Sequence, residues 1–192
     1  MAKEIIFIRH SSLAVPRGVC YGFADIDVSS NFSMEADWLK RTLGAFNPGV
    51  VVTSPLQRCV KLAVEVFNAP ITVNDNLKEV NYGDWEGEKW EDIGVEGDNL
   101  WMYKNINNRP PNGESFKELQ ARVIEVFDDI SKNNQDKIVV VCHGGVIRSI
   151  LSHILSTPLA KTRSYDIHYV GFVKFEKSNE DWRLVELNSG YR

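Results

Sequence analysis

The stretch Ile5-Ile6-Phe7-Ile8-Arg9-His10-Ser11 decides the fold of this chain. Its first four residues predict a buried β-strand, because a short apolar run with β-branched members is typical of a strand covered on both faces. Arg9 and His10 follow at the point where this strand would end. Since ligands of open α/β sheets bind beyond the carboxyl ends of the strands, the strand delivers a fixed cation and a titratable ring to a ligand site.

Length, composition and charge narrow the kind of protein. The 192 residues suffice for one domain with a sizeable core and are too few for two ordinary domains, so we expect residues 1–192 to form a single domain. Apolar residues make up 43% of the chain and charged residues 25%, as in soluble globular proteins. The net charge of −4 provides no general basic field, so we expect neither nucleic acid nor a membrane as a partner.

The sequence also bears on where the protein works. No apolar run approaches the roughly 18 residues of a membrane span. Residues Met1–Glu4 lead directly into the first strand, without the charged and apolar regions of a signal peptide. The three cysteines, Cys20, Cys59 and Cys142, lack a metal-binding spacing, so we expect reduced thiols. These features predict a cytoplasmic protein.

Strands alternate with helices along the rest of the chain. Apolar runs predict further strands at 49–53, 71–73 and 137–142. We expect helices at 31–46, 54–67, 98–105 and 114–132, and one more after His143. The alternating segment 169–187, with a turn at 178–181, predicts a hairpin. This order predicts an α/β protein, a three-layer α/β/α sandwich with a mainly parallel central sheet and an antiparallel hairpin at its edge.

Two local features refine this outline. The pair Ser54-Pro55 predicts the start of the second helix, because serine is a favoured N-cap residue and proline a favoured first helical residue. Two long loops remain, at 11–30 and 74–97, and loops of that length in a compact domain are usually functional or disordered. Tyr21 and Phe23 favour order in the first of them.

Polar residues of one chemical type follow three of the predicted strands. These residues are Arg9 and His10 after the first strand, Arg58 one turn beyond the second, and His143 with Gly144 and Gly145 after the strand at 137–142. Parallel neighbours would bring two arginines, two histidines and two helix N-termini around one cavity. Guanidinium groups and helix N-termini bind oxyanions, and glycines permit a close backbone approach. The sequence therefore predicts a phosphoryl group as the ligand.

A histidine in such a pocket can do more than bind. One ring nitrogen of His10 could attack phosphorus, provided that a backbone carbonyl or polar group holds the other nitrogen in one tautomer. Arg9, Arg58 and His143 would then stabilise charge on the transferred oxygens. Glu79 in the second loop is the candidate general acid, and Glu86 in the same loop is the alternative. No metal or other cofactor is required, because the arginines supply the positive charge.

Four separated motifs together resemble the histidine phosphatase superfamily, whose members include the cofactor-dependent phosphoglycerate mutases. The motifs are Ile8-Arg9-His10-Ser11, Ser54-Pro55-Leu56-Gln57-Arg58, Glu79 to Gly83 with Trp85-Glu86-Gly87, and Val141-Cys142-His143-Gly144-Gly145. The resemblance implies a phosphohistidine intermediate at His10 and an acid/base at Glu79. It also implies phosphate contacts from Arg9, Arg58 and His143.

Two further stretches resemble one branch, the α-ribazole phosphatases of cobalamin synthesis. They are Gly18-Val19-Cys20-Tyr21-Gly22, followed by Asp25 and Asp27, and Pro110-Pro111-Asn112-Gly113-Glu114-Ser115. The resemblance implies α-ribazole 5′-phosphate as substrate, with Cys20, Tyr21 and Glu86 as candidate contacts to its alcohol half. Two positions depart from the superfamily pattern. Ser11 replaces the usual glycine, and Pro16 replaces the asparagine of mutases, which favours a phosphatase over a mutase.

The residues leave several functions open. The leading hypothesis is a metal-independent phosphomonoesterase acting on a small phosphate ester. The alternatives are a broad sugar-phosphate phosphatase, an enzyme of the phosphoglycerate mutase type, and a phosphate-binding module without turnover. The predicted edge hairpin at 169–187 offers a strand that could pair between subunits of a homodimer.

Overall fold

A computed structural model describes residues 3–95, 100–178, 181–188 and 190–191. In this part of the chain six strands form one sheet, in the order β3-β2-β4-β1-β5-β6. The strands are β1 (Glu4–Arg9), β2 (Val50–Thr53), β3 (Ile71–Val73), β4 (Lys137–Cys142), β5 (Phe172–Ser178) and β6 (Asp181–Asn188). The first four pair in parallel, and β5 and β6 continue the sheet antiparallel. The predicted mainly parallel sheet with an edge hairpin is confirmed, although residues 179–180 of its turn lie outside the described residues.

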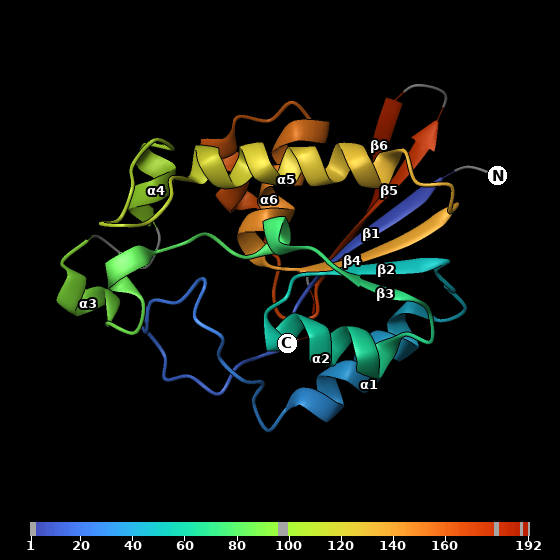
Figure 1. The fold of residues 1–192 in the computed structure, drawn as a ribbon, viewed down its shortest axis with the longest axis horizontal. Coiled ribbons are helices and arrows are strands. Elements are labelled where there is room, and N and C mark those ends of the chain that lie inside the picture. Colours follow the sequence, from blue (N-terminus) through green and yellow to red (C-terminus); the bar gives the residue numbers. More distant parts are fainter. Residues whose placement is uncertain (1–2, 96–99, 179–180, 189, 192) are drawn as a thin grey trace.

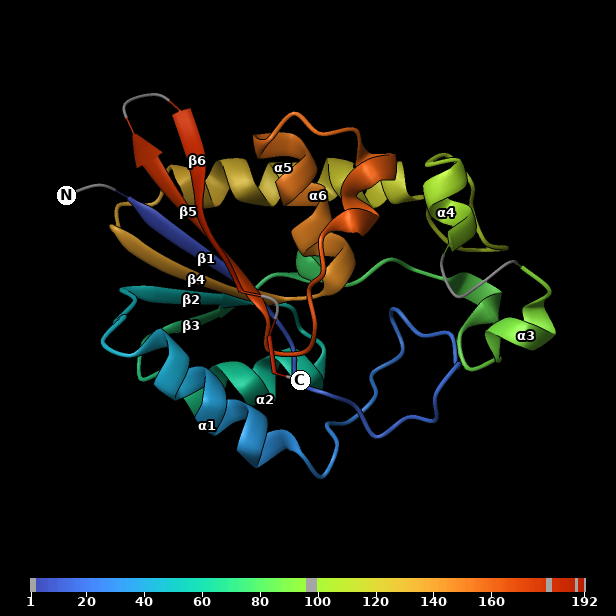
Figure 2. The ribbon, with the colours of Figure 1, turned by 180° about the vertical axis from the view of Figure 1, so that it is seen from behind.

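Helices cover both faces of the sheet, as Figures 1 and 2 show from opposite sides. One face carries α1 (Phe32–Leu43) and α2 (Gln57–Val66), and the other carries α5 (Phe116–Ser131) and α6 (Gly144–Ile154). The remaining short elements are α3 (Trp90–Ile93), α4 (Leu100–Lys104) and the 3₁₀ turns η1 (Asp75–Leu77), η2 (Gly83–Trp85) and η3 (Leu159–Ser164). The predicted three layers are thus present. Of the helix expected at 98–105, residues 98–99 lie outside the described part.

Strand β1 separates two hydrophobic cores. Ile5 and Phe7 pack in the core beneath α5 and α6, whereas Ile6 and Ile8 pack in the core beneath α1 and α2. All four side chains are at most 2% exposed. Burying side chains of this size contributes about 1.5–3 kcal/mol each, so the apolar run seen in the sequence anchors both layers and fixes where Arg9 emerges.

The second helix begins later than the sequence predicts. Ser54 does not cap it, and α2 starts at Gln57. The hydroxyl of Ser54 lies 2.8 Å from Nε2 of His143, and the amide of Gln57 donates instead to the carboxylate of Asp25 at 2.7 Å. The prediction was wrong because the capping group comes from the distant loop 11–30, which leaves Ser54 free to contact the histidine.

Loop 11–30 lies with the segment around α3 beyond the carboxyl ends of the strands (Figure 1). Short bridges join Leu13 to Val28 within the loop and Val19 to Lys89 across to the second loop. The two long loops therefore meet at the edge of the sheet where ligands of such folds bind. Among the described helices, none has the length and apolarity needed to pass through a bilayer.

Candidate active site

A cavity of about 160 Å³ opens at the carboxyl ends of β1 and β4. Its polar lining comes from Arg9, His10, Tyr21, Glu79, Arg148 and the glycine pair at 144–145. The rest of its wall is largely apolar and includes Trp90, Met102 and Phe116. Cationic, titratable and apolar groups thus face a single small space, as the strand order requires.

His10 is held in a defined tautomer. Its Nδ1 lies 2.7 Å from the carbonyl oxygen of Ser11, which can only accept, so Nδ1 carries the proton. The expected backbone partner is therefore present, and Nε2 keeps its lone pair. The ring is 2% exposed. Burial first, and then the charges of Arg58 and Arg9, hold the pKa of His10 well below its ordinary value of 6.5. The imidazole is thus neutral near pH 7, which is the state that a nucleophile needs.

Serine is accommodated after the histidine without backbone strain. Non-glycine residues with a positive φ in the described part of the chain are Asn112, Ser156 and Val170. Ser11 is fully buried, and its hydroxyl has no hydrogen-bond partner among the described residues. The loop conformation at this position therefore does not require the glycine that resembling proteins usually have.

Arg58 and His143 form a buried layer beside His10. Both are fully buried, and the rings of His10 and His143 lie 5.2 Å apart between centroids. Nε of Arg58 donates to Nδ1 of His143 at 3.4 Å, so Nε2 of His143 carries its proton and faces Ser54. The pKa of His143 also lies well below its ordinary value, because of burial first and then the charge of Arg58.

The guanidinium of Arg58 also reaches the first loop. Its Nη1 and Nη2 donate to the carbonyls of Ala24 at 2.7 Å and Gly22 at 2.6 Å. Arg58 and His143 consequently lie next to His10 as expected, but neither lines the open cavity. The predicted pair of helix N-termini is wrong in one respect. Gly144 and Gly145 at the start of α6 line the cavity, whereas the start of α2 is occupied by Asp25.

Arg9 faces the cavity with part of its donor set unused. Its Nη1 donates to the carbonyl of Ile167 at 2.8 Å, and its Cζ lies 4.5 Å from the ring centroid of Tyr169. Its buried Nε has no hydrogen-bond partner among the described residues. An unpaired guanidinium N–H in a closed site costs free energy unless an acceptor arrives, so this atom points to an anionic ligand.

Glu79 reaches the cavity from the second loop. Its Oε2 accepts from the amide of Gly145 at 3.0 Å, and its Oε1 accepts from the amide of Val80 at 3.0 Å. A Cβ atom on Gly145 would overlap the Glu79 carboxylate and lie 2.9 Å from Leu119. The glycine pair after His143 therefore permits the close approach of the Glu79 carboxyl group to the start of α6, in the same cavity as His10.

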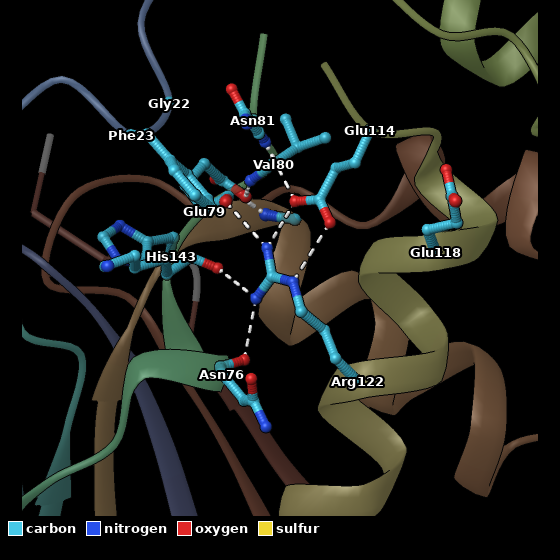
Figure 3. Close-up of polar contacts among 12 residues, drawn as sticks. Gly22, Phe23, Asn76, Glu79, Val80, Asn81, Glu114, Glu118, Arg122 and His143 are labelled. Atoms are coloured by element: carbon cyan, nitrogen blue, oxygen red, sulfur yellow. Dashed lines mark hydrogen bonds and ion pairs between the residues drawn. The ribbon is translucent and has the colours of Figure 1, made fainter. Parts of the chain in front are cut away.

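A clamp on α5 fixes the backbone that carries Glu79 (Figure 3). Arg122 pairs with both carboxylate oxygens of Glu114, at 2.5 and 3.1 Å. The same guanidinium donates to the backbone carbonyls of Asn76, Lys78 and Glu79 at 2.7–2.8 Å. Both side chains of the ion pair are only 17% exposed. Arg122 thus satisfies three loop carbonyls at once and places the acid relative to α6.

Glu86, the alternative acid, lies outside the cavity lining. Its carboxylate accepts from the amides of Phe23 at 2.8 Å, Ala24 at 2.5 Å and Tyr82 at 3.1 Å. It therefore ties the second loop to the same backbone that Arg58 holds from the other side. This geometry favours Glu79 over Glu86 as the proton donor. Glu86 instead positions loop 11–30 by accepting from two of its amides.

Of the other candidate substrate contacts, Tyr21 lines the cavity and Cys20 does not. The Tyr21 hydroxyl lies 3.1 Å from that of Tyr169, and burial raises the pKa of Tyr21 above its ordinary value. Cys20 is fully buried and is not part of the lining. Burial, followed by the charge of Glu86, raises the pKa of Cys20 to about 12.

Three residues of the site escaped the sequence analysis. Arg148 lines the cavity, Tyr169 packs on Arg9, and Arg122 holds the Glu79 segment. Arg148 had a readable signal, since it lies four residues after Gly144 on one helix and shares its face. Tyr169 and Arg122 had none, because their partners are distant in sequence.

The chain is similar to several known proteins. A putative phosphoserine phosphatase 2 of Hydrogenobacter thermophilus is 22% identical over 97% of this chain and 95% of its own length. Two solved structures share the fold. A mycobacterial glucosyl-3-phosphoglycerate phosphatase is 23% identical, with a TM-score of 0.86 over 99% of this chain and 100% of that one. A putative α-ribazole-5′-P phosphatase of Escherichia coli is 22% identical, with a TM-score of 0.87 over 98% and 97%.

The family comparison covers nearly the whole chain. The model of the histidine phosphatase superfamily (branch 1) matches residues 5–190, a range that contains every residue of the cavity described above. This range begins in β1 and ends beyond β6, so the match takes in the whole sheet except Glu4. The chain therefore belongs to the histidine phosphatase superfamily, branch 1, as a phosphoric monoester hydrolase.

Proposed function

We propose that this chain hydrolyses small phosphate monoesters through a phosphohistidine formed at Nε2 of His10. The observation that carries the proposal is the state of that ring. Nδ1 is bound to the Ser11 carbonyl, the pKa is lowered, and the free nitrogen belongs to a residue of the cavity lining. A histidine that only bound phosphate would work better as a cation, whereas this one is kept neutral.

The reaction proceeds in two steps, phosphoryl transfer to His10 and hydrolysis of the phosphohistidine. Nε2 of His10 attacks phosphorus while the ester P–O bond breaks, and protonated Glu79 gives its proton to the departing alkoxide. Glu79 then takes a proton from water, whose oxygen attacks phosphorus as the P–N bond breaks. Phosphate leaves, and both side chains return to their starting states. The negative phosphoryl group favours the protonated form of a neighbouring carboxyl, as the first step requires.

The positive charges of Arg9 and Arg58, with the neutral ring of His143 held against Arg58, would stabilise the transferred oxygens. Arg9 has its Nε free for an oxygen of the ligand. Arg58 and His143 act from the buried layer, and a phosphoryl group on His10 would compete with the loop carbonyls for the Arg58 donors. A dianion is a stronger acceptor than a carbonyl, so that exchange is favourable. The mechanism consequently needs no metal ion.

Three kinds of alcohol are candidates for the leaving half. α-Ribazole 5′-phosphate is supported by the resemblance of residues 18–22 to α-ribazole phosphatases and by the apolar wall with Trp90, Met102 and Phe116. An alcohol that bears a carboxylate is supported by a second arginine in the lining, Arg148, and by the relative named as a phosphoserine phosphatase. Sugar phosphates are the third class to compare.

Hydrolysis of 4-nitrophenyl phosphate, with and without a chelator, tests the mechanism. We expect the His10→Ala protein to lose at least about 1,000-fold in kcat, while the chelator has no effect. His153→Ala, which changes an exposed histidine of α6, is the matched control and should keep full activity. Rapid acid-free quenching should trap one phosphohistidine per wild-type chain. Full activity in His10→Ala, or loss of activity with the chelator, would refute the mechanism.

Ratios of kcat/KM for α-ribazole phosphate, phosphoserine and glucose 6-phosphate then rank the substrates.

A further inference from the structure

A second arginine faces the cavity and has no counterion among the described residues. Arg148 lies on α6, one turn after Gly144, and its side chain is half-buried. Its Nη2 reaches the carbonyl of Tyr165 at 3.4 Å, a long contact that uses one of its five donors. Its buried Nε has no hydrogen-bond partner, and no carboxylate of the described residues forms an ion pair with it. A guanidinium in this state has donors available for an acceptor that enters the cavity.

Arg148 shares this state with Arg9, which lies close by. A Cβ atom on Gly144 would lie 2.9 Å from Nη1 of Arg148 and 3.7 Å from Nε of Arg9. Both side chains therefore face the same glycine, and both leave Nε unpartnered. Two like charges in a partly closed space repel each other, and the repulsion is relieved by bound negative charge. The pair thus marks a place where more than one anionic group can bind.

Arg58 and Arg148 are held by different parts of the chain. Arg58 and His143 lie on the side of the first loop, where Arg58 holds Gly22 and Ala24. Arg148 is anchored instead at the carbonyl of Tyr165, and it lines the open cavity where Arg58 and His143 do not. The phosphoryl subsite beside His10 already has its cations. Arg148 is therefore available to a group on the leaving alcohol.

We propose that Arg148 binds a carboxylate on the alcohol half of the substrate and so selects phosphorylated carboxylic acids. The proposal rests on the phosphatase function proposed above and names the substrate class of the same site. A guanidinium binds a carboxylate through two parallel hydrogen bonds, which gives orientation as well as affinity. The scissile phosphoryl group would then lie at His10. The carboxylate would lie at Arg148, one helical turn beyond Gly144 on α6.

A matched pair of substrates isolates the carboxylate. O-Phosphoserine and O-phosphoethanolamine differ only by that group, and wild-type kcat/KM should favour phosphoserine by about 10- to 100-fold, the value of one charged hydrogen-bonded contact. In Arg148→Met this ratio should fall toward one, and Arg148→Lys should keep part of it. Arg41→Met, an exposed arginine on the other face of the sheet, should leave the ratio and both rates unchanged. Thermal unfolding checks that each variant is folded.

The remaining outcomes decide against the subsite. A wild-type ratio near one, or an equal loss on both substrates in Arg148→Met, would assign Arg148 to the phosphoryl group or to the fold and overturn the proposal. Calorimetric titration of the His10→Ala protein with both compounds measures the same preference without turnover. If wild-type protein hydrolyses neither compound nor 4-nitrophenyl phosphate, the proposed function fails. The titration of the wild-type chain still tests the carboxylate subsite, which falls if both compounds bind equally.

Discussion

One carbonyl oxygen determines what His10 can do. The Ser11 oxygen accepts a hydrogen bond from Nδ1–H, and burial first, then the charges of Arg58 and Arg9, lower the pKa of His10 so that the ring stays neutral. The sequence motifs predicted that Arg9, His10, Arg58, Glu79 and His143 would meet, and the structure brings all five to one edge of the sheet. The motifs could not say which way each donor points. The direction of Arg58 depends on the carbonyls of residues 22 and 24, and the shape of that loop leaves no periodic trace in the sequence.

The acid at this site can be tested by varying the leaving group. Glu79→Gln keeps the size of the side chain and an oxygen for the amide of Gly145, but it has no proton to give. We expect phosphohistidine formation from phosphoserine to slow by about 100- to 10,000-fold. Formation from 4-nitrophenyl phosphate should slow much less, because nitrophenolate leaves without a proton. Single-turnover quench measurements give both rates. Equal slowing of the two substrates would show that Glu79 is not the proton donor.

At the scale of elements, the long loops are shaped by contacts with the helices and with each other. Strands and helices were predictable, because their apolar periodicity is written in consecutive residues, and α5 follows its Ser115 capping box as helices usually do. The start of α2 was not predictable, since its cap is Asp25 of a separate loop. Likewise, Arg58 and Glu86 hold residues 22–24 from two sides. Loop geometry here is a set of long-range contacts.

The clamp between α5 and the second loop should control the position of Glu79. Arg122→Met leaves the Glu114 carboxylate and three carbonyls without their donor. We expect a free energy of unfolding lower by about 2 kcal/mol and a kcat lower by about tenfold, with little change in KM for 4-nitrophenyl phosphate. Denaturant unfolding and steady-state kinetics measure these changes.

The control for this clamp is a second ion pair at the same helix. Arg109 pairs with Glu118 of α5 but is 60% exposed, so Arg109→Met should change stability by less than about 1 kcal/mol and leave kcat as it was. If Arg122→Met kept full kcat despite lower stability, the clamp would serve the fold alone.

At the scale of the whole molecule, the burial of two neutral histidines makes the free energy of unfolding depend on pH. His10 and His143 are fully buried, and both have pKa values well below 6.5 in the folded chain. The unfolded chain takes up these protons near pH 6.5, whereas the folded chain does not. The free energy of unfolding should therefore fall as the pH drops below about 6.5, by up to about 1.4 kcal/mol per pH unit for each histidine.

Denaturant titrations at pH 7.5 and pH 5.5 measure this loss. His10→Gln should reduce the pH dependence, while His153→Gln, an exposed histidine of α6, should leave it unchanged. Stability that is constant or rises on acidification would contradict the neutral state of the buried pair.

The expected homodimer stays a prediction. Strand β6 lies at one edge of the sheet, where a strand of a second subunit could pair, and sedimentation would measure the oligomeric state.

The burial of the three cysteines has a practical consequence. Cys20, Cys59 and Cys142 are all fully buried, and burial raises the pKa of each thiol, to about 12 for Cys20 and Cys59. An alkylating reagent reacts with thiolate, so the native chain should resist labelling by iodoacetamide and react only through opened molecules. Mass spectrometry of the labelling rate then reports how often the neighbourhood of each cysteine opens. Fast labelling of the native protein at neutral pH would show that this chemical shielding is absent.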